Sequence, residues 1–307
     1  MRILMLGAGA IGGYYGGRLA EGGADVSFLV RDRRKAELDA NGLVVKSTLG
    51  DIALKPKTIA AGERVGPFGL VLLSCKSYDL DGAIAAIEPL MGPDSAVVPL
   101  LNGLAHLDRL AAALGRERVM GGACFISANI DPAGVIRHVG DLDRIAFGEL
   151  GGGTSARAAA LEAAFARSKT TVHPTPDIVQ TMWEKLVMLA TLAAATTLTR
   201  ATVGEIVAVP AGEAFTLGTL AECIAVATAE GHAPAAEMVA QFRAMLTARG
   251  SPFAASTMRD LVAGRRTEGD HIVGDVVRRA HAKGIAVPNL DMALLNLAVH
   301  EAKIARA

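Results

Sequence analysis

The sequence predicts two domains: an α/β domain with a parallel sheet over residues 1–175, and an all-α domain over residues 176–307. In the first part, short apolar runs of strand length alternate with helix-length segments, which is typical of a doubly wound sheet. After residue 176 the apolar residues recur with a helical period. The chain has 307 residues, 51% of them hydrophobic, which is ample material for two buried cores.

The first 31 residues predict a strand, a glycine turn, a helix and a second strand. The turn after the first strand fits the pattern G-x-G-x-x-G of a Rossmann-type dinucleotide site. Its first glycine permits a tight bend, its second lets a pyrophosphate approach the backbone, and its third lets the helix pack on the strand. The helix over residues 11–21 presents free N–H groups and the positive end of its dipole to the phosphates. The predicted pyrophosphate-binding residues are Gly7, Gly9, Ala10, Ile11 and Gly12.

The end of the second strand indicates which dinucleotide binds. An NAD site places an acidic residue about 20 residues beyond the glycines, whereas an NADP site offers arginine to the 2′-phosphate. Here the strand ends at Arg31, and Asp32, Arg33 and Arg34 follow. The planar guanidinium suits a phosphate, so we expect NADPH/NADP+ as cofactor with Arg31 on the 2′-phosphate. The alternative is that residues 31–34 form only a solvated turn.

Charge and cysteine content point to a small-molecule partner in the cytoplasm. Lys plus Arg and Asp plus Glu number 31 each, which disfavours binding to nucleic acid or an anionic membrane. The three cysteines are scattered without a C-x-x-C pair, which predicts neither disulfides nor a metal site. Residues 186–199 are 14 residues without a charge, too short to span a membrane, and predict a buried helix. Charged residues make up only 20%, which is compatible with an interface in a homodimer.

The predicted elements can be followed along the chain. In the first domain we expect a strand at 25–30, a helix at 34–40, either a small hairpin or a strand with an excursion at 43–47 and 51–54, a loop at 56–67, a strand at 70–74, a helix at 79–91, a strand at 96–101, a helix at 107–114, a strand at 119–127, an antiparallel pair at 134–139 and 144–148 with its turn at 140–143, a helix at 156–167 and a strand at 170–172. Residues 173–176 contain two prolines and predict a hinge between the domains. In the second domain we expect helices at 177–199, 212–230, 234–248, 251–264, 267–283 and 289–306. A capping box of Thr267 and Asp270 is predicted to open the fifth of them.

Three polar residues stand where chemistry is expected. Lys76 and Asn102 follow two apolar strands, and ligands of doubly wound sheets bind beyond the carboxyl ends of the strands. Lys185 lies on a helix that is apolar for three further turns, so a partly desolvated ammonium there could act as a general acid. The alternatives are a solvated post-strand residue for Lys76, a turn former before glycine for Asn102, and a solvated helix edge with Glu184 for Lys185.

Six segments in order resemble the ketopantoate reductase (2-dehydropantoate 2-reductase) family along nearly the whole chain. They are GAGAIGGYYGGRLA, CKSYD, LLNGL, the hairpin ending in FGE, WEKL and STMRDLVAGRRTEGDHI. The resemblance implies a Rossmann domain and a helical domain like that of 6-phosphogluconate dehydrogenases. It also implies NADPH-dependent reduction of the C2 ketone of ketopantoate to pantoate, in pantothenate biosynthesis.

The resemblance assigns roles to particular residues. Lys185 matches the general acid, and Lys76 and Asn102 match residues near the nicotinamide. Ser256 matches a substrate-binding serine, and Glu268 an acid that helps to hold Lys185 and the substrate. Taken alone, Glu268 could equally be a first-turn acid that complements the helix dipole.

The sequence departs from the family on the helix of Lys185. The family usually carries asparagine four and eight residues after the lysine, and these positions are Leu189 and Ala193 here. The three side chains share one helix face, so this part of the predicted substrate site is apolar. Two rival functions stay open: reduction of a different, more apolar 2-oxo acid, and a non-catalytic NADPH-binding sensor.

Overall fold

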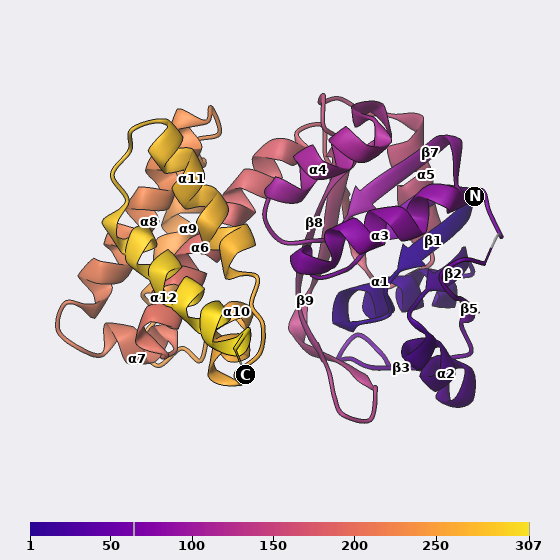
Figure 1. Cartoon of the computed structure of the whole chain (residues 1–307), viewed down its shortest axis with the longest axis horizontal. Helices are drawn as coiled ribbons and strands as arrows, with labels where there is room; N and C mark the ends of the chain where they lie inside the picture. The colour runs from indigo at the N-terminus through magenta and orange to yellow at the C-terminus, as the bar shows by residue number, and fades with distance from the viewer. Residues whose placement is uncertain (64, 307) are drawn as a thin grey trace. The chain divides into compact units, whose positions relative to one another are not determined.

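The computed structural model describes residues 1–63 and 65–306, which form two compact units (Figure 1). Unit 1 comprises residues 1–102 and 106–181, and unit 2 comprises residues 103–105 and those from 182 onward. The division therefore lies at Thr181, inside helix α6 (Ile178–Thr199), whereas the sequence predicted it at residue 175. Arg64, in the predicted loop, and Ala307, in the predicted helical domain, lie outside the described residues.

Unit 1 contains an all-parallel sheet in the order β5-β2-β1-β6-β7. Its strands are β1 (Arg2–Leu6), β2 (Asp25–Leu29), β5 (Lys57–Ile59), β6 (Phe68–Leu73) and β7 (Met91–Pro99). Leu6 is aligned with Leu29 on one side and with Leu73 on the other, and Leu73 is aligned with Pro99. The carboxyl ends of the four long strands therefore meet at one edge. The strand order reverses beside β1, which is where such sheets bind ligands.

Helices and a second sheet cover the two faces of the parallel sheet. Ile3 and Met5 of β1 belong to a core shared with α1 (Ala10–Glu21), α5 (Ala156–Phe165) and the second sheet. Leu4 and Leu6 belong to the opposite core, with α3 (Leu80–Ile87) and α4 (Ala105–Leu114). Because both faces are buried, the strands are continuous apolar runs rather than alternating ones.

The second sheet of unit 1 has the order β10-β9-β3-β4, with β8 paired to β9. Its strands are β3 (Leu43–Lys46), β4 (Ile52–Leu54), β8 (Met120–Ile130), β9 (Ile136–Glu149) and β10 (Thr171–Pro174). The predicted hairpin of β3 and β4 is present and antiparallel. Helix α2 (Asp32–Asn41) connects β2 to this sheet.

The predicted antiparallel pair at 134–139 and 144–148 is wrong, because both segments belong to the single strand β9. Both halves of β9 pair with β8, and the register shifts between Ile126 and Ala128, so that residues 139–142 loop out without reversing the chain. His138 and Asp143, the residues on either side of this excursion, are both buried. A glycine at 140 looks like a hairpin turn in sequence, whereas the partner strand decides that it is a bulge.

Two local predictions also fail. The segment 56–67 was expected to be loop throughout, but β5 lies within it, because Ile59 is buried and the strand completes the sheet edge beside β2. The helix expected over 79–91 is α-helical only from Leu80 to Ile87, with short 3₁₀ turns before and after it. Pro89, which has no amide hydrogen to donate, lies in the second of these turns.

The segment 173–176, predicted as a hinge between the domains, overlaps a strand at its first two residues. Residues 171–174 form β10, which pairs in parallel with β9 and ties the segment into unit 1. Pro174 is tolerated because β10 is an edge strand. Backbone hydrogen bonding to β9 extends one residue beyond the strand, because the N–H of Thr175 donates to the carbonyl of Phe147 at 3.0 Å. A side chain at Gly148 would lie 2.2 Å from the Thr175 carbonyl oxygen, so this close approach requires glycine.

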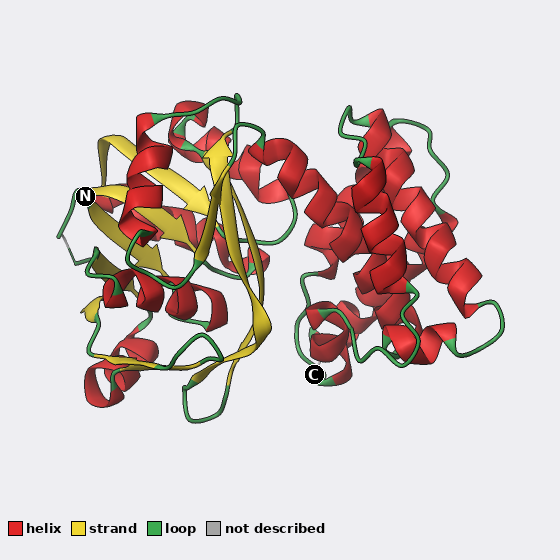
Figure 2. Ribbon diagram, turned by 180° about the vertical axis from the view of Figure 1, so that it is seen from behind, coloured by secondary structure: helices red, strands yellow, loops and turns green. Residues whose placement is uncertain are grey.

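The described part of unit 2 consists of helices joined by loops and contains no strand (Figure 2). Its helices are α6 (Ile178–Thr199), α7 (Val203–Val207), α8 (Gly212–Ala229), α9 (Ala236–Leu246), α10 (Ser256–Val262), the π-helical turn η4 (Asp270–Gly274), α11 (Asp275–Ala282) and α12 (Pro288–Ile304). The predicted capping box is absent: Thr267 donates to Glu301, and Asp270 pairs with Arg278. The fold class predicted from the sequence, a Rossmann-type α/β domain followed by an all-α domain, is confirmed.

Candidate active site

The glycine turn has the backbone geometry that a dinucleotide needs. Gly7 has a positive φ of 91°, and a Cβ there would lie 2.2 Å from the carbonyl oxygen of Ser74. A Cβ on Gly12 would lie 2.3 Å from the carbonyl oxygen of Gly7, so α1 can pack this closely only with glycine. A Cβ on Gly9 would have no atom of the protein within 4 Å, and Gly9 is exposed. The turn is therefore tight on the protein side and open at its middle glycine.

Helix α1 begins directly after this turn. Gly9 is its N-cap residue, without a side-chain cap, and its carbonyl accepts the first helical hydrogen bond from Gly13 at 2.8 Å. The N–H groups of the first helical turn are the ones that an α-helix cannot satisfy internally. Together with the helix dipole, they make this end suited to a pyrophosphate. These residues fit a nicotinamide dinucleotide.

The other predicted cofactor residues of unit 1 lie at the same sheet edge. Gly9 comes three residues after the aligned position Leu6, Lys76 three after Leu73, and Asn102 three after Pro99. Lys76 and Asn102 are both half-buried. The strand register therefore brings the glycine turn and these two residues to the carboxyl edge of the sheet, on either side of the position where the strand order reverses.

Arg31 extends into solvent beside this edge. Its side chain is 81% exposed, and its Nη2 lies 3.0 Å from Oδ1 of Asp79 in the turn after β6. An exposed ion pair of this kind contributes little to stability, so a phosphate can compete for the guanidinium. Arg33 is even more exposed and pairs with Glu37 on its own helix.

Arg34 is the residue that sequence reasoning did not single out. Its side chain is only 18% exposed, and its Nε donates to the carbonyl of Ala8, inside the glycine turn, at 3.1 Å. The only local signal was the run of arginines at 31–34, which does not tell which of them turns inward.

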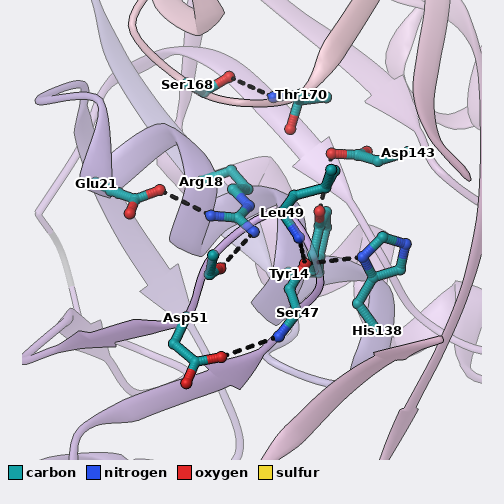
Figure 3. A network of polar contacts seen from close by, with 11 residues as sticks. Tyr14, Arg18, Glu21, Ser47, Leu49, Asp51, His138, Asp143, Ser168 and Thr170 are labelled. Atoms are coloured by element: carbon teal, nitrogen blue, oxygen red, sulfur yellow. Dashed lines mark hydrogen bonds and ion pairs between the residues drawn. The ribbon is translucent and has the colours of Figure 1, made fainter. Parts of the chain in front are cut away.

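A buried polar network connects α1 with the second sheet of unit 1 (Figure 3). The Tyr14 hydroxyl donates to Oδ2 of Asp143 at 2.8 Å, and Oγ of Ser47 lies 2.9 Å from Nδ1 of His138. Arg18, fully buried, donates through Nη2 to a carbonyl in the turn between β3 and β4 at 2.8 Å. Burial raises the pKa of the Asp143 carboxyl above its usual value, and the bond from Tyr14 opposes part of this rise. Helix α1, which begins at the glycine turn, is thus tied to β9 and to the β3–β4 turn.

Replacing Asp143 with asparagine is expected to remove a pH-dependent part of the stability. Because the folded-state pKa of Asp143 is raised, the folded protein holds that proton more tightly than the unfolded chain does. The carboxyl therefore favours folding most at low pH, and this contribution is lost as the pH rises from about 4 through the raised pKa. We expect the free energy of unfolding of the wild type, minus that of Asp143→Asn, to fall over this range in urea titrations. A difference that is constant with pH would contradict the assignment.

In unit 2, α6 carries the predicted general acid. Lys185 and Leu189 are half-buried and Ala193 is buried, at spacings of four that place them on one helix face. Two residues before Lys185, the Trp183 ring is stacked on the His232 ring at 5.6 Å between centroids. The Arg279 guanidinium lies 5.2 Å from the Trp183 ring. These contacts fix the stretch of α6 that carries Lys185.

The remaining predicted substrate residues lie elsewhere in unit 2. Ser256 is exposed at the first position of α10, and the preceding Ala255 N–H donates to Oγ1 of Thr196 on α6 at 3.5 Å. Glu268 is half-buried just before η4. In that turn, His271 packs against Gly103, where a Cβ would meet its ring at 3.1 Å. The chain directly after Asn102 thus packs next to the turn that follows Glu268.

Comparison with known proteins identifies the family. The family model described as ketopantoate reductase PanE/ApbA matches residues 3–152, and the model described as ketopantoate reductase PanE/ApbA C terminal matches residues 177–301. The chain belongs to the ketopantoate reductase family.

Individual relatives of this ketopantoate reductase family member extend over the full length. An uncharacterized oxidoreductase, YkpB, of Bacillus subtilis is 38% identical over 304 residues, which cover 99% of this chain and 100% of the relative. A 2-dehydropantoate 2-reductase of Halobacterium salinarum is 31% identical and covers 94% of this chain and 95% of its own. The crystal structure of 2-dehydropantoate 2-reductase from Geobacter metallireducens GS-15 superposes with a TM-score of 0.88 at 32% identity, covering 97% of this chain and 99% of that one.

As a member of the ketopantoate reductase family, the protein is an oxidoreductase that acts on CH–OH groups with a nicotinamide cofactor. Among the residues that the structure describes, no group of three or more His, Cys, Asp or Glu is arranged to hold a metal ion. Helix α6 is long and apolar enough to cross a membrane by length and composition, but 67% of its most apolar 18-residue window is buried inside the fold. This burial is the pattern of a core helix.

Proposed function

We propose that the protein reduces the C2 ketone of 2-dehydropantoate (ketopantoate) to the hydroxyl of pantoate with NADPH, using Lys185 as general acid. The observation that carries this proposal is that the family models match both halves of the chain, so that the glycine turn and Lys185 each lie inside matched residues. Glu268 and Ser256 lie within the second match as well.

The residues of unit 1 have the cofactor role in this proposal. The glycine turn and the first turn of α1 hold the pyrophosphate, and Arg31 binds the 2′-phosphate. Lys76 and Asn102, half-buried at the sheet edge, orient the nicotinamide end. When bound, NADPH supplies the hydride that adds to the ketone carbon.

The residues of unit 2 have the acid and substrate roles. The Lys185 ammonium gives a proton to the ketone oxygen as the carbon is reduced, which completes the hydroxyl, and the neutral amine regains a proton from water. Glu268 keeps Lys185 charged and directed, and Ser256 donates a hydrogen bond to a carboxylate or hydroxyl of the substrate.

A second candidate is reduction of a 2-oxo acid with a more apolar tail. Leu189 and Ala193, on the face of α6 that carries Lys185, offer no hydrogen bonds where the family usually offers amides. A site without partners for a polar substrate group loses affinity and discrimination for it. This observation bears on the substrate and not on the reaction.

Steady-state oxidation of NADPH over a panel of 2-oxo acids tests the proposal. We expect turnover with branched 2-oxo acids, with ketopantoate giving the highest kcat/KM. A higher kcat/KM for an acid with a longer apolar tail would replace ketopantoate by the second candidate. Tight binding of NADPH with no turnover on any member of the panel would refute the enzymatic proposal and favour a cofactor sensor.

The proposal also places the protein in the cytoplasm, in pantothenate biosynthesis, and as a homodimer. Cys75, Cys124 and Cys223, all in the described part of the chain, form no disulfide, which is compatible with a reducing compartment. Met292, Leu295 and Val299 form an exposed apolar stripe along α12, which supports association through unit 2. Light scattering of the purified protein measures the molar mass in solution. A monomer at all concentrations would contradict the dimer.

A further inference from the structure

The arginine run after β2 splits into two kinds of side chain. Arg31 and Arg33 are 81% and 93% exposed, whereas Arg34 is 18% exposed. Arg31 caps α2 and Arg34 lies in its first turn, so the helix turns Arg34 toward the body of unit 1. A guanidinium is removed from water this far only where it gains hydrogen bonds in return.

Arg34 bonds to three different parts of unit 1. Its Nε donates to the carbonyl of Ala8 at 3.1 Å, its Nη2 donates to the carbonyl of Gly134 at 3.3 Å, and its Nη1 lies 3.2 Å from a carboxylate oxygen of Glu37. Ala8 is inside the glycine turn, and Gly134 is in the turn between β8 and β9, 100 residues away in sequence. The rigid, planar fork of arginine fixes the mutual position of these groups, which a lysine ammonium cannot do.

The bond to Ala8 determines how the glycine turn presents its backbone. A trans peptide is planar, with its carbonyl and its N–H pointing in opposite directions. Because Arg34 holds the carbonyl of Ala8, the N–H of Gly9 must point away from Arg34. Gly9 is exposed, and a Cβ on it would have no atom of the protein within 4 Å. Arg34 therefore orients the peptide at the open middle of the turn.

The anchor at the other end is itself rigid. Asp131 accepts from the N–H groups of Ala133 and Val135, both at 3.0 Å, and from Nε of Arg137 at 2.9 Å. A further backbone bond from the N–H of Gly134 to the carbonyl of Asp131, at 2.9 Å, closes the same turn. A Cβ on Gly134 would lie 2.9 Å from Nη1 of Arg34, so a side chain there would displace the end of the guanidinium.

We propose that Arg34 is a positioning residue for the cofactor: it holds the glycine turn in its pyrophosphate-binding form by bracing it against the β8–β9 turn. The inference rests on the proposed use of a nicotinamide dinucleotide. It assigns to Arg34 a role that is independent of the 2′-phosphate, which distinguishes it from Arg31. Both NADPH and NADH contain the pyrophosphate, so both depend on Arg34.

Cofactor affinity of Arg34 variants tests this role. The dissociation constants of NADPH and NADH are measured by cofactor fluorescence, without substrate, for the wild type, Arg34→Lys and Arg34→Gln. We expect both variants to weaken both cofactors by about tenfold, with an unchanged NADPH-to-NADH ratio, because two charged hydrogen bonds to the backbone are lost. The lysine variant keeps the charge and loses the fork, so it should be no better than glutamine.

A glycine pair supplies the matched control. Gly134→Ala and Gly140→Ala both place a side chain at positive φ, 79° and 78°, in the same part of unit 1. A Cβ meets Arg34 only at Gly134, since nothing lies within 4 Å of one at Gly140. We expect Gly134→Ala to weaken both cofactors as the Arg34 variants do, and Gly140→Ala to leave both dissociation constants within about twofold. Thermal unfolding of the ligand-free variants separates these effects from loss of the fold.

Three results would overturn the inference. Loss of NADPH affinity alone would make Arg34 a second 2′-phosphate ligand. Full recovery in Arg34→Lys would mean that the charge acts on the phosphates and that the fork does not position the turn. Unchanged affinities in folded variants would leave Arg34 a purely structural residue. Failure of the proposed reaction is seen separately, in the wild type with substrate, because these measurements use cofactor alone.

Discussion

Replacing Lys185 with alanine is expected to lower kcat by about 10² or more, which is the usual scale for a lost general acid. The side chain is half-buried on α6, and the neighbouring Trp183 is held by His232 and Arg279, so the truncation should leave the helix in place. The dissociation constant of NADPH should stay within about twofold, because the glycine turn and Arg31 belong to unit 1. Steady-state kinetics and cofactor fluorescence on the same preparation measure both.

Lys303→Ala is the matched control, since Lys303 is an exposed lysine near the end of α12 in the same unit. It should retain the wild-type kcat. Addition of a small primary amine should restore part of the activity of Lys185→Ala and none to any variant that is inactive through misfolding. A Lys185→Ala enzyme with near-normal kcat would remove Lys185 from the reaction and leave Glu184 and Lys185 as a helix edge.

Replacing Arg31 with alanine is expected to weaken NADPH by about 10- to 100-fold and NADH by less than about twofold. A hydrogen bond to a charged group contributes about 1.5–3 kcal/mol, and each 1.4 kcal/mol corresponds to a factor of ten. Arg31 can reach a 2′-phosphate because its side chain is 81% exposed and its ion pair with Asp79 is open to solvent. NADH has no 2′-phosphate, so its dissociation constant should be nearly unchanged by the substitution.

Arg33→Ala controls for the removal of one positive charge from the same segment. Arg33 is 93% exposed and pairs with Glu37, so this variant should bind NADPH nearly as the wild type does. The loss in Arg31→Ala should also shrink as the salt concentration is raised, because an exposed charge is screened. Equal losses for the two cofactors in Arg31→Ala would refute the 2′-phosphate role.

Much of unit 1 could be predicted from short stretches of sequence. The strands of the parallel sheet are buried on both faces, so they stand out as apolar runs, and the glycine turn is defined by steric limits that act within a few residues. The same locality explains the failures. The predicted turn at 140–143 contains a glycine, but pairing of both sides with β8 makes residues 139–142 a bulge. Pro174 suggests a hinge, but its edge position in the second sheet makes it a strand residue.

The candidate site divides in the same way. Gly7, Gly12, Arg31 and Lys185 could be predicted as site residues from residue type, spacing and resemblance, because these signals lie in short stretches of sequence. Arg34 was not, since its partners Ala8 and Gly134 are 26 and 100 residues away. The network of Tyr14 with Asp143 was missed for the same reason, being 129 residues apart.

By itself, then, the sequence determined the fold class, the glycine turn and the order of the family's segments, because these follow from local propensity, hydrophobic period and short-range sterics. The tertiary structure alone decided which arginine of the run turns inward, where β9 bulges, and where the chain passes from unit 1 to unit 2. Those outcomes depend on hydrogen bonds and packing between residues far apart in sequence, and a local pattern carries no information about which distant group will be the partner.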